Sequence, residues 1–345
     1  MLPGFDRAAV GPAAWRDADN DRVPTVVVAQ GTVLNRVLDA TCRPVRDGLN
    51  RRAYGTFHTA RMKTAWGGHC QRTFALVEGR SILASAEQYD LTAVLDGRAV
   101  RVCGIGSIWT EPSRWGLGHA RVLIDSLLDE AAREGAELGL LFPKKGVDDD
   151  DVGDDFEAIH FTDLTLSVVQ SPRYGAPMTM VRGGEPRDLA AIASMGRIRA
   201  EPFRFHLDRD VDFVQYAITT KRLLAGLGPA NARQLHFFIA EEGITAAAYV
   251  VVSVAGQTWT LEECGDRDPS GARVGALLQA LIAREPMERR PTIRAWLPPR
   301  FLPPQVTIAS TARSTEAVGV RMLGSRAMAA PLSGEDVLFW RNDLF

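Results

Sequence analysis

The feature that most constrains the fold is a run of three strand-like segments followed at once by a helix and a wholly apolar strand. Alternating and β-branched residues predict strands over 72–78, 81–94 and 98–110. The Asp96-Gly97 pair before the last of these is typical of a tight hairpin. The middle strand is long enough to require a bulge or a bend. Three consecutive strands joined by short turns predict an antiparallel meander.

The segment after the meander predicts a parallel crossover. Apolar residues recur three and four positions apart between Ala120 and Ala131, which predicts a helix from about residue 115 to 134. The strand predicted over 137–142 (ELGLLF) is apolar throughout, as a strand covered on both faces should be. A strand, a helix and a strand in this order form a parallel βαβ unit beside the meander.

The same order of elements occurs again in the second half of the chain. Strands are predicted over 234–240, 244–254 and 258–263, a helix over 272–283 and a strand over 292–297. Repetition of one pattern indicates a duplicated fold. The predicted fold class is α/β (α+β), with two tandem domains, each a mixed, mostly antiparallel sheet with a central parallel βαβ crossover.

A Pro- and Gly-rich segment between the halves marks the predicted domain boundary. The length of 345 residues agrees with two domains of roughly 150 residues each. We expect a flexible leader at 1–24, a first domain at 25–170 that closes with two short strands over 158–169, a linker at 171–185, and a second domain at 186–345 with a C-terminal tail.

Composition argues against several classes of protein. The 40 basic and 42 acidic residues nearly cancel, so we expect neither nucleic-acid nor membrane binding by general electrostatic attraction. The sequence shows no apolar run of about 20 residues and no secretory leader pattern, which predicts a cytoplasmic protein. The 4 cysteines form no CxxC pair and the 6 histidines no HxH or HxxxH pair, so no disulfide framework or metal site is expected. The oligomeric state stays open, a homo-oligomer included.

The turn between the third strand and the first helix carries chemical information. It reads IWTEPSRWGLGHA from Ile108 to Ala120, with glycines at 116 and 118. Glycine lets a backbone approach a ligand closely, and the N–H groups at a helix N-terminus favour phosphate. Two glycines are equally compatible with an ordinary strand-to-helix turn. No GK[ST] follows, so this is not a P-loop, and the antiparallel meander disfavours a Rossmann site.

This segment resembles motif A of the GCN5-related N-acetyltransferases (the GNAT superfamily). That motif runs proline, two residues, Gln or Arg, two residues, Gly, one residue, and Gly or Ala. Counting from Pro112 puts Trp115 at the Gln/Arg position, Gly118 at the glycine and Ala120 at the small residue. The basic residue is displaced by one position to Arg114, which puts its side-chain contact in doubt but leaves the backbone unaffected.

The resemblance covers about residues 25–170 and extends to two subfamilies. The segments ILASAEQYDL and GIGSIWTEPSRWGLGHA look most like fungal lysine N6-acetyltransferases. The doubled domain is similar to that of the enhanced-intracellular-survival acetyltransferases. Members of both groups act on amines of small molecules.

The resemblance implies acetyl-coenzyme A (acetyl-CoA) as cofactor and assigns residues to it. The backbone of Ile108, Trp109 and Thr110 would pair with the pantetheine arm, in a slot where the strand ending at Thr110 and the strand at 137–142 splay apart. The pyrophosphate would lie on backbone amides with a contribution from Arg114, the amides being those of Trp115, Gly116, Leu117, Gly118, His119 and Ala120.

Acetyl transfer to an amine requires a proton acceptor, and a proton donor assists the leaving thiolate. Glu87 is the predicted base because it interrupts an apolar and small-residue stretch; the alternative is a side chain facing solvent on the outer side of the sheet. Relatives often carry an acidic tyrosine after the fifth strand. The corresponding stretch here, GVDDDDVGDDF, holds Asp150 and Asp151 instead, so the acid is absent or comes from Tyr89 or Tyr54.

Aromatic residues before and within the meander are predicted to line the amine pocket. They are Phe57, Trp66 and Tyr89, with His58 beside them, and the alternative is that they are core residues. In the survival-type relatives the terminal carboxylate enters the active site of the first domain, so the resemblance implies that role for Phe345.

The second half is predicted to be a degenerate domain without cofactor. Its corresponding turn, 265–273, lacks the GxGxA spacing and carries two aspartates that would repel a pyrophosphate. The predicted activity is acetyl transfer from acetyl-CoA to a primary amine of a small molecule (lysine-like, polyamine or aminoglycoside-like), by direct attack in a ternary complex. Two alternatives remain, a protein or peptide N-acetyltransferase and a non-catalytic acyl-CoA sensor.

Overall fold

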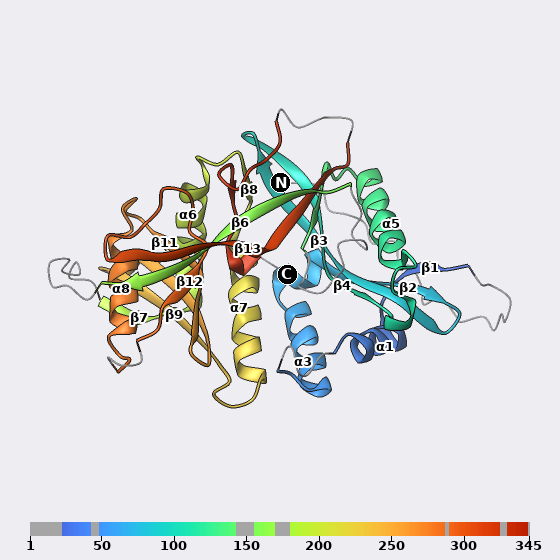
Figure 1. The fold of residues 1–345 in the computed structure, drawn as a ribbon, viewed down its shortest axis with the longest axis horizontal. Helices are drawn as coiled ribbons and strands as arrows, with labels where there is room; N and C mark the ends of the chain where they lie inside the picture. The colour runs from blue at the N-terminus through green and yellow to red at the C-terminus, as the bar shows by residue number, and fades with distance from the viewer. Residues whose placement is uncertain are drawn as a thin grey trace.

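The chain forms two α/β halves that lie side by side along the longest axis of the molecule (Figure 1). A computed structural model describes residues 23–42, 48–142, 155–169, 180–286, 290–324 and 330–343. Twelve strands form one continuous sheet path that runs through both halves. The N-terminal half lies on the right of Figure 1 and the C-terminal half on the left.

The first half confirms the predicted meander and crossover. Strands β2 to β4 pair antiparallel in sequence order, and β5 pairs parallel with β4 after the intervening helix α5. The predicted Asp96-Gly97 turn has positive φ angles of 49° and 77°, the conformation that such hairpins need. The elements are β1 (Thr25–Val28), β2 (Gln71–Glu78), β3 (Ser81–Leu95), β4 (Arg98–Thr110), α5 (His119–Arg133) and β5 (Leu138–Leu141).

Helices cover both faces of the first sheet. Side chains alternate between the two faces along each strand. Phe74, Ala84 and Ile105 lie on the face that α5 covers, where they are buried. Side chains of the opposite parity, which include Thr73 and Glu87, point to the other face. That face carries α1 (Gly31–Thr41), α3 (Arg51–Met62) and α4 (Ala65–Cys70).

Helix α5 starts later than the predicted position near residue 115. Residues Pro112–Arg114 form a short 3-10 turn, η1. Gly116 and Gly118 then have φ angles of 74° and 75°, which a right-handed helix excludes. The helix therefore begins at His119, with Gly118 as its N-cap residue.

The second half repeats the architecture of the first, as predicted. A meander leads through a helix into a strand that pairs parallel with the last meander strand. Helices α6 and α7 lie between the two repeats in sequence. The elements are β7 (Met180–Gly183), η3 (Pro186–Asp188), α6 (Leu189–Ala200), α7 (Val211–Leu227), β9 (Arg233–Glu242), β10 (Thr245–Ala255), β11 (Thr258–Asp266), α8 (Ala272–Ile282) and β12 (Ile293–Ala295).

Two long strands cross between the halves. The prediction of two short strands over 158–169 is wrong, because the chain forms one strand, β6 (Glu157–Val168). It pairs with β13 (Val306–Met322), and its residues Leu164–Leu166 also pair with β12 of the second half. The end of β13, Gly319–Met322, pairs with β5 of the first half. Each half thus completes its sheet with a strand from the other, and the predicted domain limits remain a prediction.

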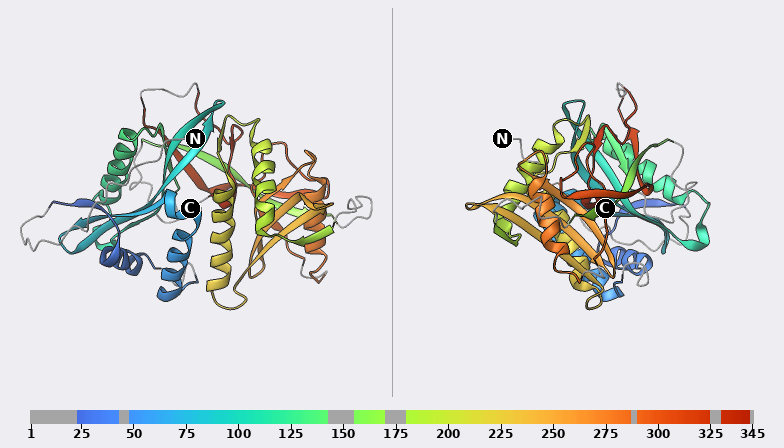
Figure 2. Two further views of the ribbon diagram at one scale, coloured as in Figure 1. Left: turned by 180° about the vertical axis from the view of Figure 1, so that it is seen from behind. Right: turned by 60° about the vertical axis from the view of Figure 1, so that its left-hand side comes forward.

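A second connection between the halves lies at the centre of the molecule. Helices α3 and α7 pack against each other there, as Figures 1 and 2 both show. The short strand β8 (Phe205–Leu207) pairs with β3 and with β14 (Val337–Leu338). The described chain ends in η5 (Arg341–Asp343), which contacts both α7 and β11.

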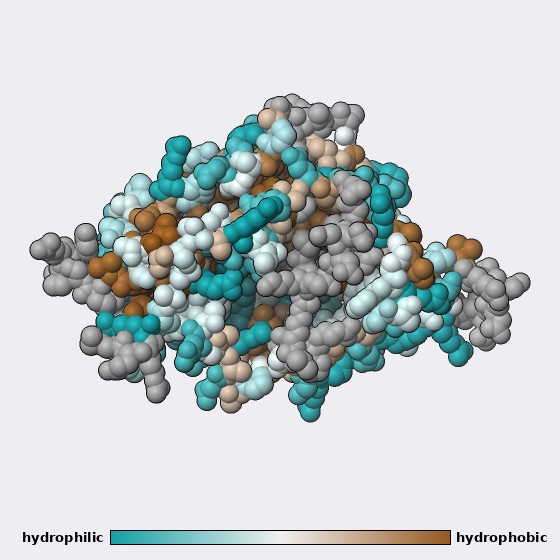
Figure 3. Space-filling view, viewed as in Figure 1, coloured by the Kyte–Doolittle hydropathy of each residue, from teal (hydrophilic) through white to brown (hydrophobic). Residues whose placement is uncertain are grey.

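The surface mixes polar and apolar residues. On the face drawn in Figure 3, hydrophobic residues form separate small groups among hydrophilic ones. In the described ranges, no helix has both the length and the apolar character needed to span a membrane.

Candidate cofactor and acceptor site

Strands β4 and β5 separate where the predicted pantetheine slot begins. Their last paired residues are Ile105 and Leu141, and the Phe142 N–H donates to the Ile105 carbonyl over 2.8 Å. Beyond this point β4 continues to Thr110, and its described partners there lie on β3 only. A bulge opposite Ala86 shifts the register, and Ser107 within it has a φ of 50°. The backbone of Ile108, Trp109 and Thr110 therefore lies beyond the end of β5.

The turn that follows forms a cradle, defined here as residues 115–120. Its two glycines adopt the left-handed conformation, and a Cβ added to either would meet no atom within 4 Å, so the space beside them is open. No side chain caps the N-terminus of α5, and no acidic residue lies in its first turn. The first backbone bond into the helix runs from the Val122 N–H to the Gly118 carbonyl, at 3.0 Å. Among the cradle amides, that of Leu117 donates to the Arg114 carbonyl over 3.4 Å, and those of Gly116, Gly118, His119 and Ala120 make no backbone bond to a described residue, so they are available to an anion.

Side chains around the cradle leave it accessible. Trp115 and Leu117 are 59% and 61% exposed, and the Trp115 indole N–H donates to the Thr110 carbonyl over 3.1 Å. Arg114 lies 3.9 Å from Glu78 in an exposed ion pair, so its charge remains near the turn. Ala120 is buried at 1% exposure, which fixes the start of α5 against the core.

Three buried polar atoms on β3, on β4 and at the start of α5 have no partner among the described residues. Within the described residues, Nε1 of Trp109, Nε2 of His119 and Oγ of Ser85 are buried and make no hydrogen bond. Buried polar atoms in folded proteins are nearly always satisfied, so an unpartnered atom within the cradle, Nε2 of His119, points to a ligand. Together with the open glycines and the uncapped helix, this atom fits an acyl-CoA.

The corresponding turn of the second half is closed. Asp266 accepts hydrogen bonds from the N–H groups of Arg273 (2.9 Å) and Val274 (3.2 Å), in the first turn of α8. Gly271 has a φ of 72°, as Gly118 does, but a Cβ there would lie 2.7 Å from the Phe301 ring. A carboxylate of the chain and an aromatic ring thus occupy the places that a pyrophosphate would need.

Glu87 is buried on β3 and does not face solvent. It belongs to the Glu87 cluster, defined as Arg61, Glu87, Tyr89, Ser107 and Tyr216. The Arg61 guanidinium lies 3.4 Å from Glu87 Oε2, the Ser107 hydroxyl donates to the same oxygen over 3.1 Å, and the Tyr89 hydroxyl donates to it as well. Tyr216, from α7 of the second half, accepts from Arg61 Nε over 3.1 Å.

Burial and charge in the Glu87 cluster raise the pKa values of its two tyrosines. Burial raises the pKa of Tyr216 to about 12, with the Arg61 charge opposing the shift. Burial, reinforced by the Glu87 carboxylate, raises the pKa of Tyr89 well above its usual value. Both hydroxyls are therefore protonated donors at neutral pH.

The aromatic residues that were predicted to line the amine pocket lie close together, but they are buried. Trp66 packs on the rings of Tyr89 and Tyr216, with centroids 6.4 Å and 4.6 Å apart. Tyr89 has no exposed surface, and Phe57 lies under the Arg61 guanidinium, 5.2 Å from its carbon. Trp66 and Tyr89 belong to a hydrophobic core, so their contact with an amine stays a prediction. The Tyr54 hydroxyl lies 3.2 Å from that of Thr41 on α1.

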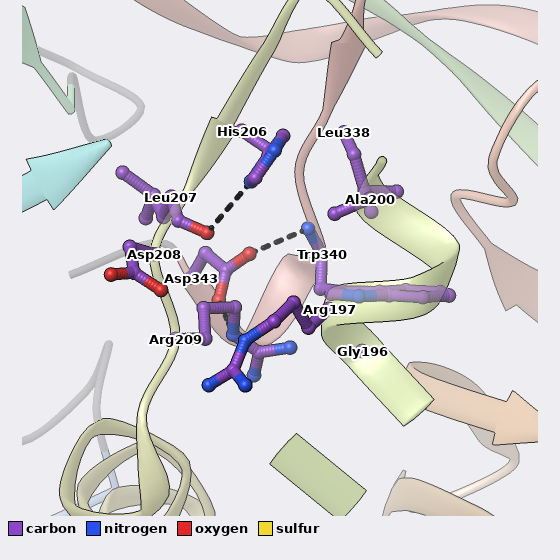
Figure 4. Close-up of a pocket in the computed structure, with 10 residues that line it drawn as sticks. All are labelled: Gly196, Arg197, Ala200, His206, Leu207, Asp208, Arg209, Leu338, Trp340 and Asp343. Carbon is purple, nitrogen blue, oxygen red and sulfur yellow. Dashed lines mark hydrogen bonds and ion pairs between the residues drawn. The ribbon is translucent and has the colours of Figure 1, made fainter. Parts of the chain in front are cut away.

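The end of the described chain reaches the centre of the molecule. Asp343 lies 3.0 Å from Arg209 Nε and accepts from the Trp340 N–H over 2.9 Å (Figure 4). Asn342 donates over 3.0 Å to Glu263, which Arg209 also holds. Phe345 itself, and the acid candidates Asp150 and Asp151, lie outside the described residues, so their roles stay predictions.

Sequence reasoning missed the residues that complete the Glu87 cluster. Arg61 and Tyr216 are 155 positions apart, and only the packing of α3 on α7 brings them together. Ser107 reaches Glu87 because of the bulge in β4, whose position no residue pattern marked. Helical periodicity in 211–227 was the one available sign of α7.

Comparison with known proteins gives a fold but no close relative. No protein-family profile matches the sequence, and no curated protein matches it significantly. The chain is similar to a GCN5-related N-acetyltransferase from Kribbella flavida, with 16% identity, a TM-score of 0.59, and coverage of 87% of this chain and 72% of that one.

Two further solved structures agree. A GCN5-related N-acetyltransferase from Anabaena variabilis has 10% identity, a TM-score of 0.61, and coverage of 88% of this chain and 73% of that one. Eis1 from Mycobacterium abscessus has 13% identity, a TM-score of 0.53, and coverage of 87% and 74%. The chain therefore has the fold of the GCN5-related N-acetyltransferases, with tandem domains of that type.

Proposed function

We propose that this protein is an N-acetyltransferase that uses acetyl-CoA and acetylates a primary amine of a small molecule. The cradle is the observation that carries the proposal. It combines two open left-handed glycines with an uncapped helix N-terminus directly beyond the point where β4 and β5 separate. Positive helix ends of this kind favour the pyrophosphate group.

The residues assigned to the cofactor act through their backbone. The amides of the cradle would hold the pyrophosphate, and Arg114 would add positive charge beside it. At Ile108, Trp109 and Thr110, the edge of β4 beyond β5 has no strand partner among the described residues and would bind the pantetheine arm as an added strand does. When bound, acetyl-CoA supplies an acetyl thioester, the group that an amine attacks.

Helix α7 supports a small acceptor. It packs on α3, and its Tyr216 hydroxyl donates to Gln71 over 2.9 Å and contacts Arg61, so the second half covers the acceptor side of the first sheet. A sheet face covered in this way favours lysine-like amines, polyamines or aminoglycosides over a folded protein. We place the amine beside the Ser107 bulge, with Glu87 as the carboxylate of the acceptor site.

The test combines acetyl-CoA binding with release of free CoA. The full-length protein is titrated with acetyl-CoA by calorimetry and then assayed against lysine, polyamines, aminoglycosides and short lysine peptides. We expect binding and CoA release with one small-amine class. Release with peptides alone would replace the small acceptor with a protein one. Binding without any release would indicate a sensor, and no binding would overturn the proposal.

A further inference from the structure

A solvent-open cavity of about 640 Å³ lies outside the cradle and the Glu87 cluster. Residues of β6 between 160 and 164 form its first wall, residues 296–302 after β12 form the second, and residues of the segment 334–339, which contains β14, form the third. Ile308 of β13 also lines it. Cavities that hold small ligands have volumes of roughly 300–1,000 Å³, so this one has the size for a small organic molecule.

Aromatic and aliphatic side chains form most of the cavity lining. The rings of Phe161 and Trp296 stack with their centroids 4.3 Å apart, and Phe339 meets Phe161 edge-on at 5.9 Å. Two other lining residues, Leu302 and Ile308, are 43% and 45% exposed, which is unusual for large hydrophobic side chains. Exposed apolar side chains beside an aromatic cavity favour a ligand with an apolar or aromatic body.

The acidic group that contacts the aromatic pair is already paired with cations. Asp163 accepts hydrogen bonds from the Trp296 indole N–H over 2.7 Å and from Arg294 over 2.8 Å. It also accepts one from Arg341, whose guanidinium carbon lies 4.4 Å from the centre of the Trp296 ring. These contacts hold the indole in place, and two guanidinium groups offset the charge of Asp163.

A strained turn places Arg300 at the cavity. The Phe301 N–H donates to the Pro298 carbonyl over 3.0 Å and closes a turn over residues 298–301. Arg300, the third residue of this turn, has a φ of 64°, where glycine or asparagine is normally found. The turn over 229–232 is closed in the same way, and its third residue is Asn231, with a φ of 61°. An arginine kept at such a position despite the backbone strain points to a functional role of its side chain.

The charges on the cavity lining indicate the polar part of the ligand. Arg300 is exposed and makes no ion pair with any residue in the described ranges. A guanidinium of this kind binds a carboxylate through two parallel hydrogen bonds. Glu335 on the third wall is exposed and likewise has no ion pair within the described chain, so it would repel a second negative charge. The lining therefore favours a ligand with a single negative charge.

We propose that this cavity binds an organic monocarboxylate with an aromatic body, as a second ligand site that is independent of the proposed acetyl transfer. The carboxylate pairs with Arg300, and the ring of the ligand contacts the apolar lining, which includes Phe161, Leu302 and Ile308. None of the lining residues belongs to the cradle or to the Glu87 cluster. The two sites can therefore be occupied at the same time.

The test uses anilinonaphthalene sulfonate, an aromatic monoanion whose fluorescence rises in apolar cavities, with the folded full-length protein. In the R300G variant the cation is lost and the strained φ is relieved, so the fold should be retained. We expect R300G to bind the dye about 10- to 100-fold more weakly, because a hydrogen bond to a charged group is lost. N231G, which makes the same backbone change in the turn over 229–232, is the matched control and should bind the dye as wild type does.

Two further measurements address the cavity and the charge separately. Thr162 is an exposed residue of the β6 wall, and T162F should weaken dye binding by filling the cavity. Naphthoate should displace the dye from wild type about tenfold better than naphthamide, its uncharged analogue, since only the carboxylate pairs with Arg300. Excess acetyl-CoA should leave dye binding unchanged.

Several outcomes would overturn the proposal. They are no dye binding by wild type, equal affinity in wild type, R300G and T162F, and equal displacement by naphthoate and naphthamide. Displacement of the dye by acetyl-CoA would place it in the cradle and would also overturn the proposal, while supporting the proposed function. Circular dichroism checks that each variant is folded. Should R300G fail to fold, R300Q, which keeps the length of the side chain without its charge, is measured in its place.

Discussion

Gly118 shows how one backbone angle shapes the cradle that we propose for the cofactor. Its φ of 75° places the first amides of α5 so that they face open space, and no neighbouring atom forces this conformation. Any other L-residue at this position would be strained by about 1–2 kcal/mol, or would relax and rotate the amides away. Glycine is thus required here by the backbone conformation of the turn and not by packing.

Replacing Gly118 with alanine should weaken acetyl-CoA binding by about tenfold or more, because roughly 1–2 kcal/mol of strain or misalignment falls on the cradle. Gly79 is the matched control, since it has a φ of 56° with equally open surroundings but lies in the β2–β3 turn. Calorimetric titration should show wild-type affinity for G79A, although both variants lose similar stability. Equal affinities in all three proteins would mean that the cradle does not hold the cofactor.

The sequence predicted the cradle better than the acceptor site for a physical reason. Gly116, Gly118 and Ala120 are local requirements of one turn, so a short motif records them. The contacts of Glu87 instead depend on Arg61 from α3 and Tyr216 from α7, which are far apart in the chain. The sequence left two orientations of Glu87 open, one buried and one facing solvent. Alternation along a strand does not say which face of the sheet a helix will cover.

The turn before α8 is the clearest difference between the two repeats. Both α5 and α8 begin after a left-handed glycine, so the backbone path is retained. In α8 the Asp266 carboxylate binds the N-terminal amides that α5 leaves open. Periodicity predicted both helices, and the lost GxGxA spacing and the two aspartates of the turn indicated that the second one would not hold a pyrophosphate.

Replacing Asp266 with alanine should destabilise the protein by about 1–2 kcal/mol, the usual cost of losing a carboxylate at a helix N-terminus. It should not create a second cofactor site, because Phe301 still covers Gly271. Urea unfolding measures the loss of stability. Calorimetric titration of D266A with acetyl-CoA should still give one bound equivalent per chain. D268A, which alters a neighbouring aspartate of the same turn, is the control. A second bound equivalent in wild type or in D266A would contradict this account.

The two halves are joined by their sheets and not only by a linker. The exchange of β6 and β13 places residues 319–322 beside β5, whose leucines 138, 140 and 141 are at most 1% exposed. No local pattern could predict this, because either half could in principle have closed its own sheet with the strand that follows its βαβ unit. The predicted order of elements was right, but the sequence did not specify which strands β6 and β13 would pair with.

A fragment of residues 1–170 should therefore fail to fold, because it exposes an apolar strand edge that β13 covers in the whole chain. Circular dichroism and size-exclusion chromatography should show an aggregated or unfolded species. The matched control is the full chain cut at a protease site introduced between residues 171 and 179. Its two pieces should stay together and folded. A monomeric fragment with a cooperative melting transition would show that the first half is independent.

The exchanged strand also affects how the protein is made. Domains of most multidomain chains fold in order as they leave the ribosome, the N-terminal one first. Here β5 lacks its neighbour until residues 319–322 have been translated, so the sheet of the first half stays incomplete through nearly all of synthesis. At roughly 5–20 residues per second, the interval after β5 has been made is on the order of ten seconds or more. Newly made chains are thus exposed to aggregation and to chaperones for longer than the size of either half would suggest.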